Sequence, residues 1–216
     1  MTQAKSSVVA PYFRDVDQQR QANTLGMWAF LVTETMLFGG LFVVYSAYRL
    51  AYPEAFKVAS NELDFVLATI NTIVLLTSSL MMALAVRSAQ TNKKKALITF
   101  LLLTIFLGAI FLGIKGFEYA QKFQHHQVPG YNFAFDHPEF AHAAELFFAL
   151  YFMTTGIHAF HMIIGVGVLL YMTYRAYKNH FSSIHYDALE MTGLYWHFVD
   201  IAWVFIFPLY YLIDKT

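Results

Sequence analysis

Polar and apolar residues alternate along this chain in long blocks. Five apolar runs are each long enough, at about 1.5 Å per residue, to cross a hydrocarbon layer of roughly 30 Å as a helix. The runs cover Leu25–Tyr48, Phe65–Val86, Ala96–Phe117, Leu146–Tyr174 and Met191–Ile213. The pattern therefore predicts an all-α fold, an integral membrane bundle of five transmembrane helices in one domain (residues 25–213). A polar tail (residues 1–24) precedes it.

Composition supports a membrane protein and narrows its chemistry. Hydrophobic residues make up 58% of the 216 residues, charged residues 13%, and the mean hydropathy is +0.48. Soluble domains carry roughly twice that charged share. The chain has no cysteine, which excludes disulfides, thiolate nucleophiles and iron–sulfur clusters. Its formal net charge of zero gives no reason to expect a nucleic acid as partner.

Lysine and arginine are distributed unequally between the two sides that the five runs define. Short loops rich in these residues stay in the cytoplasm. One side holds nine of them: Lys5, Arg14, Arg20, Arg87, Lys93, Lys94, Lys95, Arg175 and Lys178. The other side holds four: Arg49, Lys57, Lys122 and Lys215. The bias predicts a cytoplasmic N-terminal tail and an outside C-terminus.

Apart from Lys115, five ionisable residues fall within the apolar runs, where such groups normally face protein, water or a partner. They are Glu34, His158, His161, His197 and Asp200. Counted from the predicted inner ends of their helices, Glu34, His161 and Asp200 lie within a few ångströms of one depth. We therefore expect a polar layer that joins the first, fourth and fifth runs.

Three chemistries are compatible with this layer. Paired imidazoles on facing helices can bind haem or a metal, and chains of Glu and His conduct protons in pumps. We favour the third interpretation, in which these residues form hydrogen bonds between helices. Near the end of the third run, Lys115 and Glu118 are three residues apart, and the spacing predicts an ion pair.

Several segments resemble one known family, cytochrome c oxidase subunit III of the haem–copper oxidases. Residues 195–203, YWHFVDIAW, resemble the signature of its last helix, and residues 155–165, TGIHAFHMIIG, resemble its T-G-x-H-x-x-H-x-x-x-G helix. Residues 26–38 resemble its helix with a buried, carbodiimide-reactive glutamate, which is Glu34 here. Residues 70–78 and 117–119 match two more of its segments in the right order.

The resemblance implies an accessory subunit of a proton-translocating oxidase in aerobic respiration and electron transport, with no catalytic centre, haem, copper or other metal of its own. Subunit I, its direct partner, carries haem and copper and reduces dioxygen, and subunit II receives electrons. Phospholipid is the bound ligand that the family implies. The resemblance assigns the positions that match the family's pattern to lipid contact and interhelix structure, which disfavours metal ligation. These positions are Glu34, His158, His161, Glu190, Trp196, His197 and Asp200.

The number of helices and two positions refine this expectation. Larger members of the family have seven helices, and five-helix versions are the bacterial form, which implies a bacterial inner membrane. The alternative is a quinol oxidase of the bo type. Its corresponding subunit typically has aspartate at the position of Glu34 and phenylalanine at the position of Tyr195. These residues favour the cytochrome c enzyme, although cytochrome c or quinol binds other chains. An independent transporter is a more distant alternative.

Overall fold

The computed structural model describes residues 13–130, 133–178, 181 and 186–213, and the described residues contain helices and no strands. The elements are α1 (Val16–Ala51), α2 (Pro53–Asn61), α3 (Phe65–Gln90), α4 (Lys94–Gln124), the 3-10 helix η1 (Pro138–Phe140), α5 (Ala141–Tyr177) and α6 (Asp187–Tyr211). Five of them, α1, α3, α4, α5 and α6, are long and apolar enough to cross a membrane. The prediction of an all-α bundle with five membrane helices is confirmed.

Helix ends extend beyond the apolar runs where local capping permits. The first helix begins at Val16, ahead of Leu25, because the Asp15 side chain accepts a hydrogen bond from the Gln18 backbone N–H at 2.7 Å. The short helix α2 has no counterpart among the predicted runs. Its first residue is Pro53, which suits an N-terminal helical position because its missing N–H would have no intrahelical partner.

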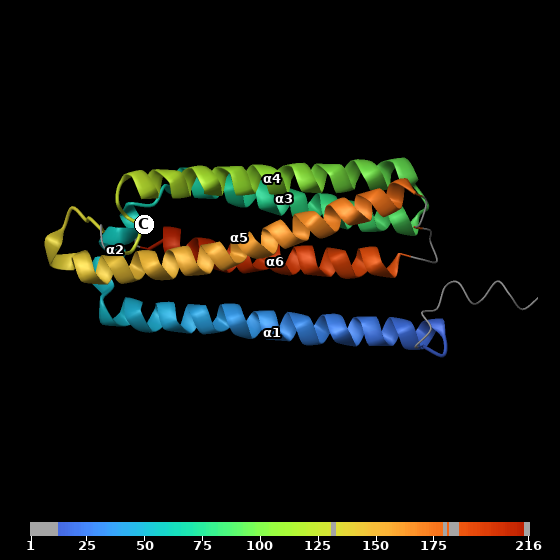
Figure 1. Cartoon of the computed structure of the whole chain (residues 1–216), viewed down its shortest axis with the longest axis horizontal. Helices are drawn as coiled ribbons and strands as arrows, with labels where there is room; N and C mark the ends of the chain where they lie inside the picture. Colours follow the sequence, from blue (N-terminus) through green and yellow to red (C-terminus); the bar gives the residue numbers. More distant parts are fainter. Residues whose placement is uncertain (1–12, 131–132, 179–180, 182–185, 214–216) are drawn as a thin grey trace, which may run out of the picture.

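The long helices run alternately up and down, so the bundle has two distinct ends (Figure 1). One end, called here the α2 end, carries α2, the loop after α4 and the C-terminus of α6. The opposite end, called the Lys93 end, carries the turn between α3 and α4. Helices α3 and α4 pack along each other, α6 contacts α3 and α5, and α1 lies at the edge of the bundle against α5 and α6.

Trp196 of α6 is the wedge at the centre of the bundle. Its ring is fully buried, and its Nε1–H donates to Ser78 Oγ of α3 at 3.1 Å. A Cβ added to Gly108 of α4 or to Gly165 of α5 would lie 2.9 Å from this ring. The two glycines therefore create the space for the indole, and one side chain contacts three neighbouring helices.

Helix α1 is attached through a much narrower face. Phe38 and Tyr45 are its only buried side chains. The Tyr45 hydroxyl donates to the Leu209 carbonyl, and Ser60 Oγ donates to the Tyr210 carbonyl at 2.7 Å. The last carbonyls of a helix lack intrahelical partners, so these contacts satisfy the end of α6 while they fix α1 and α2.

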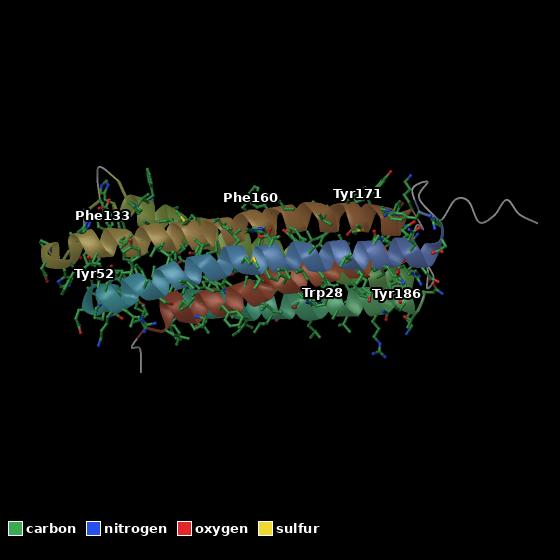
Figure 2. The ribbon with its side chains drawn as sticks, turned by 90° about the horizontal axis from the view of Figure 1, so that it is seen from below. Trp28, Tyr52, Phe133, Phe160, Tyr171 and Tyr186 are labelled. Carbon is green, nitrogen blue, oxygen red and sulfur yellow. The ribbon has the colours of Figure 1, made fainter. Side chains whose placement is uncertain are left out.

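The outward faces of the helices are apolar. Trp28 of α1 and Phe160 and Tyr171 of α5 are each more than half exposed, and Figure 2 shows Phe160 and Tyr171 pointing away from the bundle. Large apolar side chains that point outward in this way are typical of a protein that contacts lipid or partner subunits.

We predict that Gly165→Ala destabilises the bundle by about 1–3 kcal/mol, because the new methyl group overlaps the Trp196 ring and must displace it. Gly167→Ala on the same helix is the matched control, since a Cβ there meets nothing within 4 Å. The measurement is unfolding of the detergent-solubilised protein by titration with SDS. Equal stability of the two variants would contradict the claim that Gly165 provides space for the Trp196 ring.

Candidate functional site

The structure brings Glu34 of α1 and His161 of α5 together. Glu34 Oε2 lies 3.0 Å from His161 Nε2, and the side chains are 15% and 12% exposed. The Phe38 ring lies 5.7 Å from the imidazole, centroid to centroid, and the Tyr195 hydroxyl donates to the His161 carbonyl at 2.9 Å. This contact therefore joins α1, α5 and α6 within the apolar part of the bundle.

The backbone contact of His161 indicates which of its ring nitrogens carries a hydrogen. His161 Nδ1 lies 2.8 Å from the Ile157 carbonyl, which can only accept, so Nδ1 carries a hydrogen. Nε2 faces Oε2 of Glu34, but the contact lacks the geometry of a hydrogen bond, and Oε2 has no hydrogen-bond partner among the described residues.

His158 has surroundings of a different kind, although it lies only one helical turn from His161. It is fully buried between the rings of Phe111 and Trp203, at centroid distances of 5.4 and 5.1 Å. Neither of its ring nitrogens has a hydrogen-bond partner among the described residues. The two histidines thus face different neighbours and do not form a common site.

His197 and Asp200 belong to the contact between α6 and α3. His197 Nδ1 and Ser79 Oγ are 2.7 Å apart. Asp200 is 2% exposed, and neither of its carboxyl oxygens has a hydrogen-bond partner among the described residues. The expected single polar layer is therefore divided: Glu34 and His161 are in contact, whereas Asp200 is hydrogen-bonded to neither.

Glu190 lies away from the mid-membrane groups. It is in the first turn of α6 at the Lys93 end, one turn from Asp187, whose Oδ2 is 3.0 Å from Nε of Arg20. Carboxylates in the first turn interact favourably with the positive end of the helix dipole. This position suits anchoring of the helix end.

The ion pair that the spacing of Lys115 and Glu118 predicted is confirmed, with Nζ and Oε2 2.8 Å apart and exposed side-chain fractions of 6% and 2%. Sequence reasoning missed its two tyrosines. The hydroxyls of Tyr151 and Tyr211 both donate to Glu118 Oε1, at 2.7 and 2.5 Å, and Lys115 Nζ donates to the Tyr211 hydroxyl at 2.6 Å. The cluster joins α4, α5 and α6.

Lys115 also has an aromatic partner. Its Nζ lies 4.5 Å from the Trp203 ring centroid, a favourable arrangement for a desolvated cation. Within the parts of the chain that the structure describes, no group of three or more His, Cys, Asp or Glu side chains is arranged to hold a metal ion.

The fold and these contacts define a polytopic helical membrane protein whose buried polar side chains join neighbouring helices. Comparison of the sequence with known families gives a match of residues 15–214 to the family described as "Cytochrome c oxidase subunit III". The chain belongs to the cytochrome c oxidase subunit III family.

Individual relatives carry two kinds of name. The chain is 32% identical over 191 residues to "Cytochrome c oxidase subunit 3" of Alkalihalophilus pseudofirmus, which covers 87% of this chain and 85% of that protein. It is 27% identical over 192 residues to the protein of that name from Thermostichus vulcanus, with 88% and 87% covered. It is also 28% identical over 196 residues to "Probable quinol oxidase subunit 3" of Staphylococcus haemolyticus, with 91% of each covered.

We predict that Lys115→Met and Glu118→Gln each destabilise the protein by about 3–5 kcal/mol, because each leaves a buried partner uncompensated. The double variant should lose clearly less than the sum. The measurement is a double-mutant cycle of unfolding free energies.

The control for this cycle is the more exposed pair of Arg20 and Asp187. Its coupling should be much smaller, because solvent screens exposed charges. Additive losses at Lys115 and Glu118 would contradict the importance of their ion pair.

Proposed function

We propose that this chain is a non-catalytic subunit of a haem–copper terminal oxidase. The observation that carries the proposal is the family match over residues 15–214, which includes all five long helices. The chain supports, by lipid binding and stabilisation, the subunit that reduces dioxygen to water and pumps protons. Haem and copper are held by the partner subunits.

The proposed partners bind the apolar outer surface of the bundle. Subunit I is the direct partner and subunit II belongs to the same complex, while phospholipid covers the remaining surface. Helix α1 supports such a role, because Leu25, Met36 and Val43 are between 70% and 73% exposed. Removal of such side chains from water by lipid or by another apolar surface is favourable.

The proposed orientation places the Lys93 end in the cytoplasm of a bacterial cell, with the protein in the inner membrane. The argument is the excess of lysine and arginine at this end, because short loops rich in these residues stay on the cytoplasmic side. Eight such residues with described positions lie there: Arg14, Arg20, Arg87, Lys93, Lys94, Lys95, Arg175 and Lys178.

The family-patterned polar residues are proposed to hold helices together and to border bound phospholipid. Trp196, His158 and Asp200 are buried and suit interhelix packing. Glu34 of α1 and His161 of α5 remain partly exposed where these two helices meet, and a lipid can reach them there. His197 bonds to Ser79, and Glu190 marks the helix end at the Lys93 side.

A quinol oxidase subunit is the second candidate function, and the similarity to "Probable quinol oxidase subunit 3" of Staphylococcus haemolyticus favours it. The two candidates differ in the electron donor, which binds other chains. Oxidation of cytochrome c or of quinol by the purified complex distinguishes them.

The test of the proposed function is purification in mild detergent through a tag on this chain, with a reduced-minus-oxidised visible spectrum and mass identification of the co-purifying proteins. The proposal expects haem signals that belong to the co-purifying subunits. These signals should be absent from this chain once it has been separated from those subunits. A chain that purifies alone and colourless overturns it in favour of an independent transporter, and haem retained on the isolated chain overturns the non-catalytic role.

We predict that Glu34→Gln leaves the initial rate of dioxygen reduction near normal but shortens the period over which the complex remains active and reduces the retained phospholipid. The reason is that the substitution removes the carboxyl group that lies against His161 and weakens the attachment of α1.

The measurement for Glu34→Gln is oxygen consumption over time together with lipid mass spectrometry of the assembled complex. Glu54→Gln, at an exposed position of α2, is the control and should change neither. Immediate loss of all activity in an assembled complex would contradict the non-catalytic role.

A further inference from the structure

The outward face of α3 carries a groove where the helix reaches the Lys93 end of the bundle (Figure 1). Its volume is about 570 Å³. The lining residues are Ala83, Leu84, Val86, Arg87, Gln90 and Thr91. The first three are apolar and the last three are polar. The groove, called here the Arg87 groove, therefore offers an apolar and a polar environment to a single ligand.

The apolar half of the Arg87 groove continues a stripe of outward-facing side chains on α3. Ile73, Leu76 and Leu80 are each more than half exposed, and residues three or four apart lie on the same side of a helix. Ala83 follows Leu80 on this side, and its small side chain is exposed. It leaves a depression between two longer side chains, Leu80 and Arg87. A lipid chain that follows the stripe reaches this depression.

Arg87 lies at the level where the hydrocarbon layer ends, because the apolar run of α3 ends at Val86. Helix α3 contains no acidic residue. Within the part of the chain that the structure describes, the guanidinium of Arg87 has no ion pair or hydrogen bond. Its five N–H donors are therefore directed at the membrane interface.

The polar half of the groove has the chemistry that a phosphate group requires. A planar guanidinium matches two phosphate oxygens with two parallel hydrogen bonds. Gln90, one turn beyond Arg87, adds an amide donor to the same wall. The Thr91 hydroxyl donates to the Arg87 carbonyl at 3.0 Å, so it offers only its oxygen to a ligand. A phosphate diester with hydroxyl groups nearby satisfies all three side chains.

The residues after α3 favour an anionic ligand over a zwitterionic one. Lys93, Lys94 and Lys95 are all exposed in the turn that follows the groove. Lysine and arginine next to a membrane surface attract anionic lipids, and each contributes about 1 kcal/mol. The groove itself has one cation and no acidic lining residue. Its charge therefore complements a lipid with a net negative headgroup.

We propose that the Arg87 groove binds one anionic phospholipid from the leaflet at the Lys93 end, an inference that rests on the proposed lipid-binding role of this chain. The phosphate accepts hydrogen bonds from the Arg87 guanidinium, Gln90 contacts the ester or headgroup oxygens, and an acyl chain packs over Ala83 and Leu84. The site is separate from Glu34, which lies on α1 against α5.

The test uses the purified complex in nanodiscs of phosphatidylcholine with a small fraction of phosphatidylglycerol that carries a photoactivatable acyl chain. Illumination should cross-link this lipid to residues 83–91, as mapped by mass spectrometry. Arg87→Gln should reduce the cross-linking several-fold, and Arg87→Lys should reduce it less, because an ammonium keeps the charge without the planar pair of donors. Lys178→Gln removes an exposed charge at the same end outside the groove and should leave it unchanged.

A second variant tests the apolar half while Arg87 stays in place. Ala83→Trp fills the depression and should also reduce cross-linking at the groove several-fold. Ala47→Trp, on the exposed surface of α1, is the matched control and should not reduce it. An excess of inorganic phosphate should leave the cross-linking unchanged, because free phosphate gains nothing from the apolar half.

Four results overturn the proposal. Equal cross-linking in Arg87→Gln and Lys178→Gln means that Arg87 serves only the orientation of the chain and the end of its helix. Equal cross-linking of a photoactivatable phosphatidylcholine excludes selection for an anionic lipid. Displacement by inorganic phosphate indicates a site for a free anion, and cross-links from this groove to another subunit indicate that protein covers it. The readout is a lipid on this chain, so it remains informative if the haem spectrum excludes an oxidase.

Discussion

The packing of α3, α4, α5 and α6 depends on the insertion of Trp196 between glycines. In a membrane, helices gain little from burial of apolar surface, because lipid is as apolar as their side chains. Close van der Waals packing must therefore supply much of the stabilisation. Gly108 and Gly165 allow the indole ring to approach two backbones, and Ser78 satisfies the indole N–H from a third helix. Burial of the indole N–H would be unfavourable without a partner, and its hydrogen bond to Ser78 defines the register of α6 against α3.

Polar contacts secure the parts of the bundle that this wedge does not reach. At the α2 end, the carboxylate of Glu118 accepts hydrogen bonds from three side chains on three helices. Along α1, where few side chains are buried, the contact of Glu34 with His161 and the hydroxyl of Tyr45 take over the same role. The helix with the least apolar packing is thus the one for which polar contacts matter most, and that explains why an ionisable residue is tolerated at this depth.

The sequence predicts those features that depend on local periodicity or spacing. The five apolar runs lead to five membrane helices, and the three-residue spacing of Lys115 and Glu118 leads to their ion pair. It does not predict α2, because a short helix of mixed polarity carries no apolar run. Nor does it predict that Ser79 faces His197 or that Tyr211 closes the cluster around Glu118, since these contacts join residues about a hundred positions apart.

The two histidines of α5 show why spacing alone does not define a metal site. Residues three apart on a helix share a face only broadly, since they differ by about 60° in direction at 3.6 residues per turn. That angle is enough for His161 to reach α1 while His158 enters the aromatic interior beside Trp203. A ligand pair requires both imidazoles to converge on one point, whereas here each imidazole fills a different interface. The arrangement therefore favours helix association as the role of these residues.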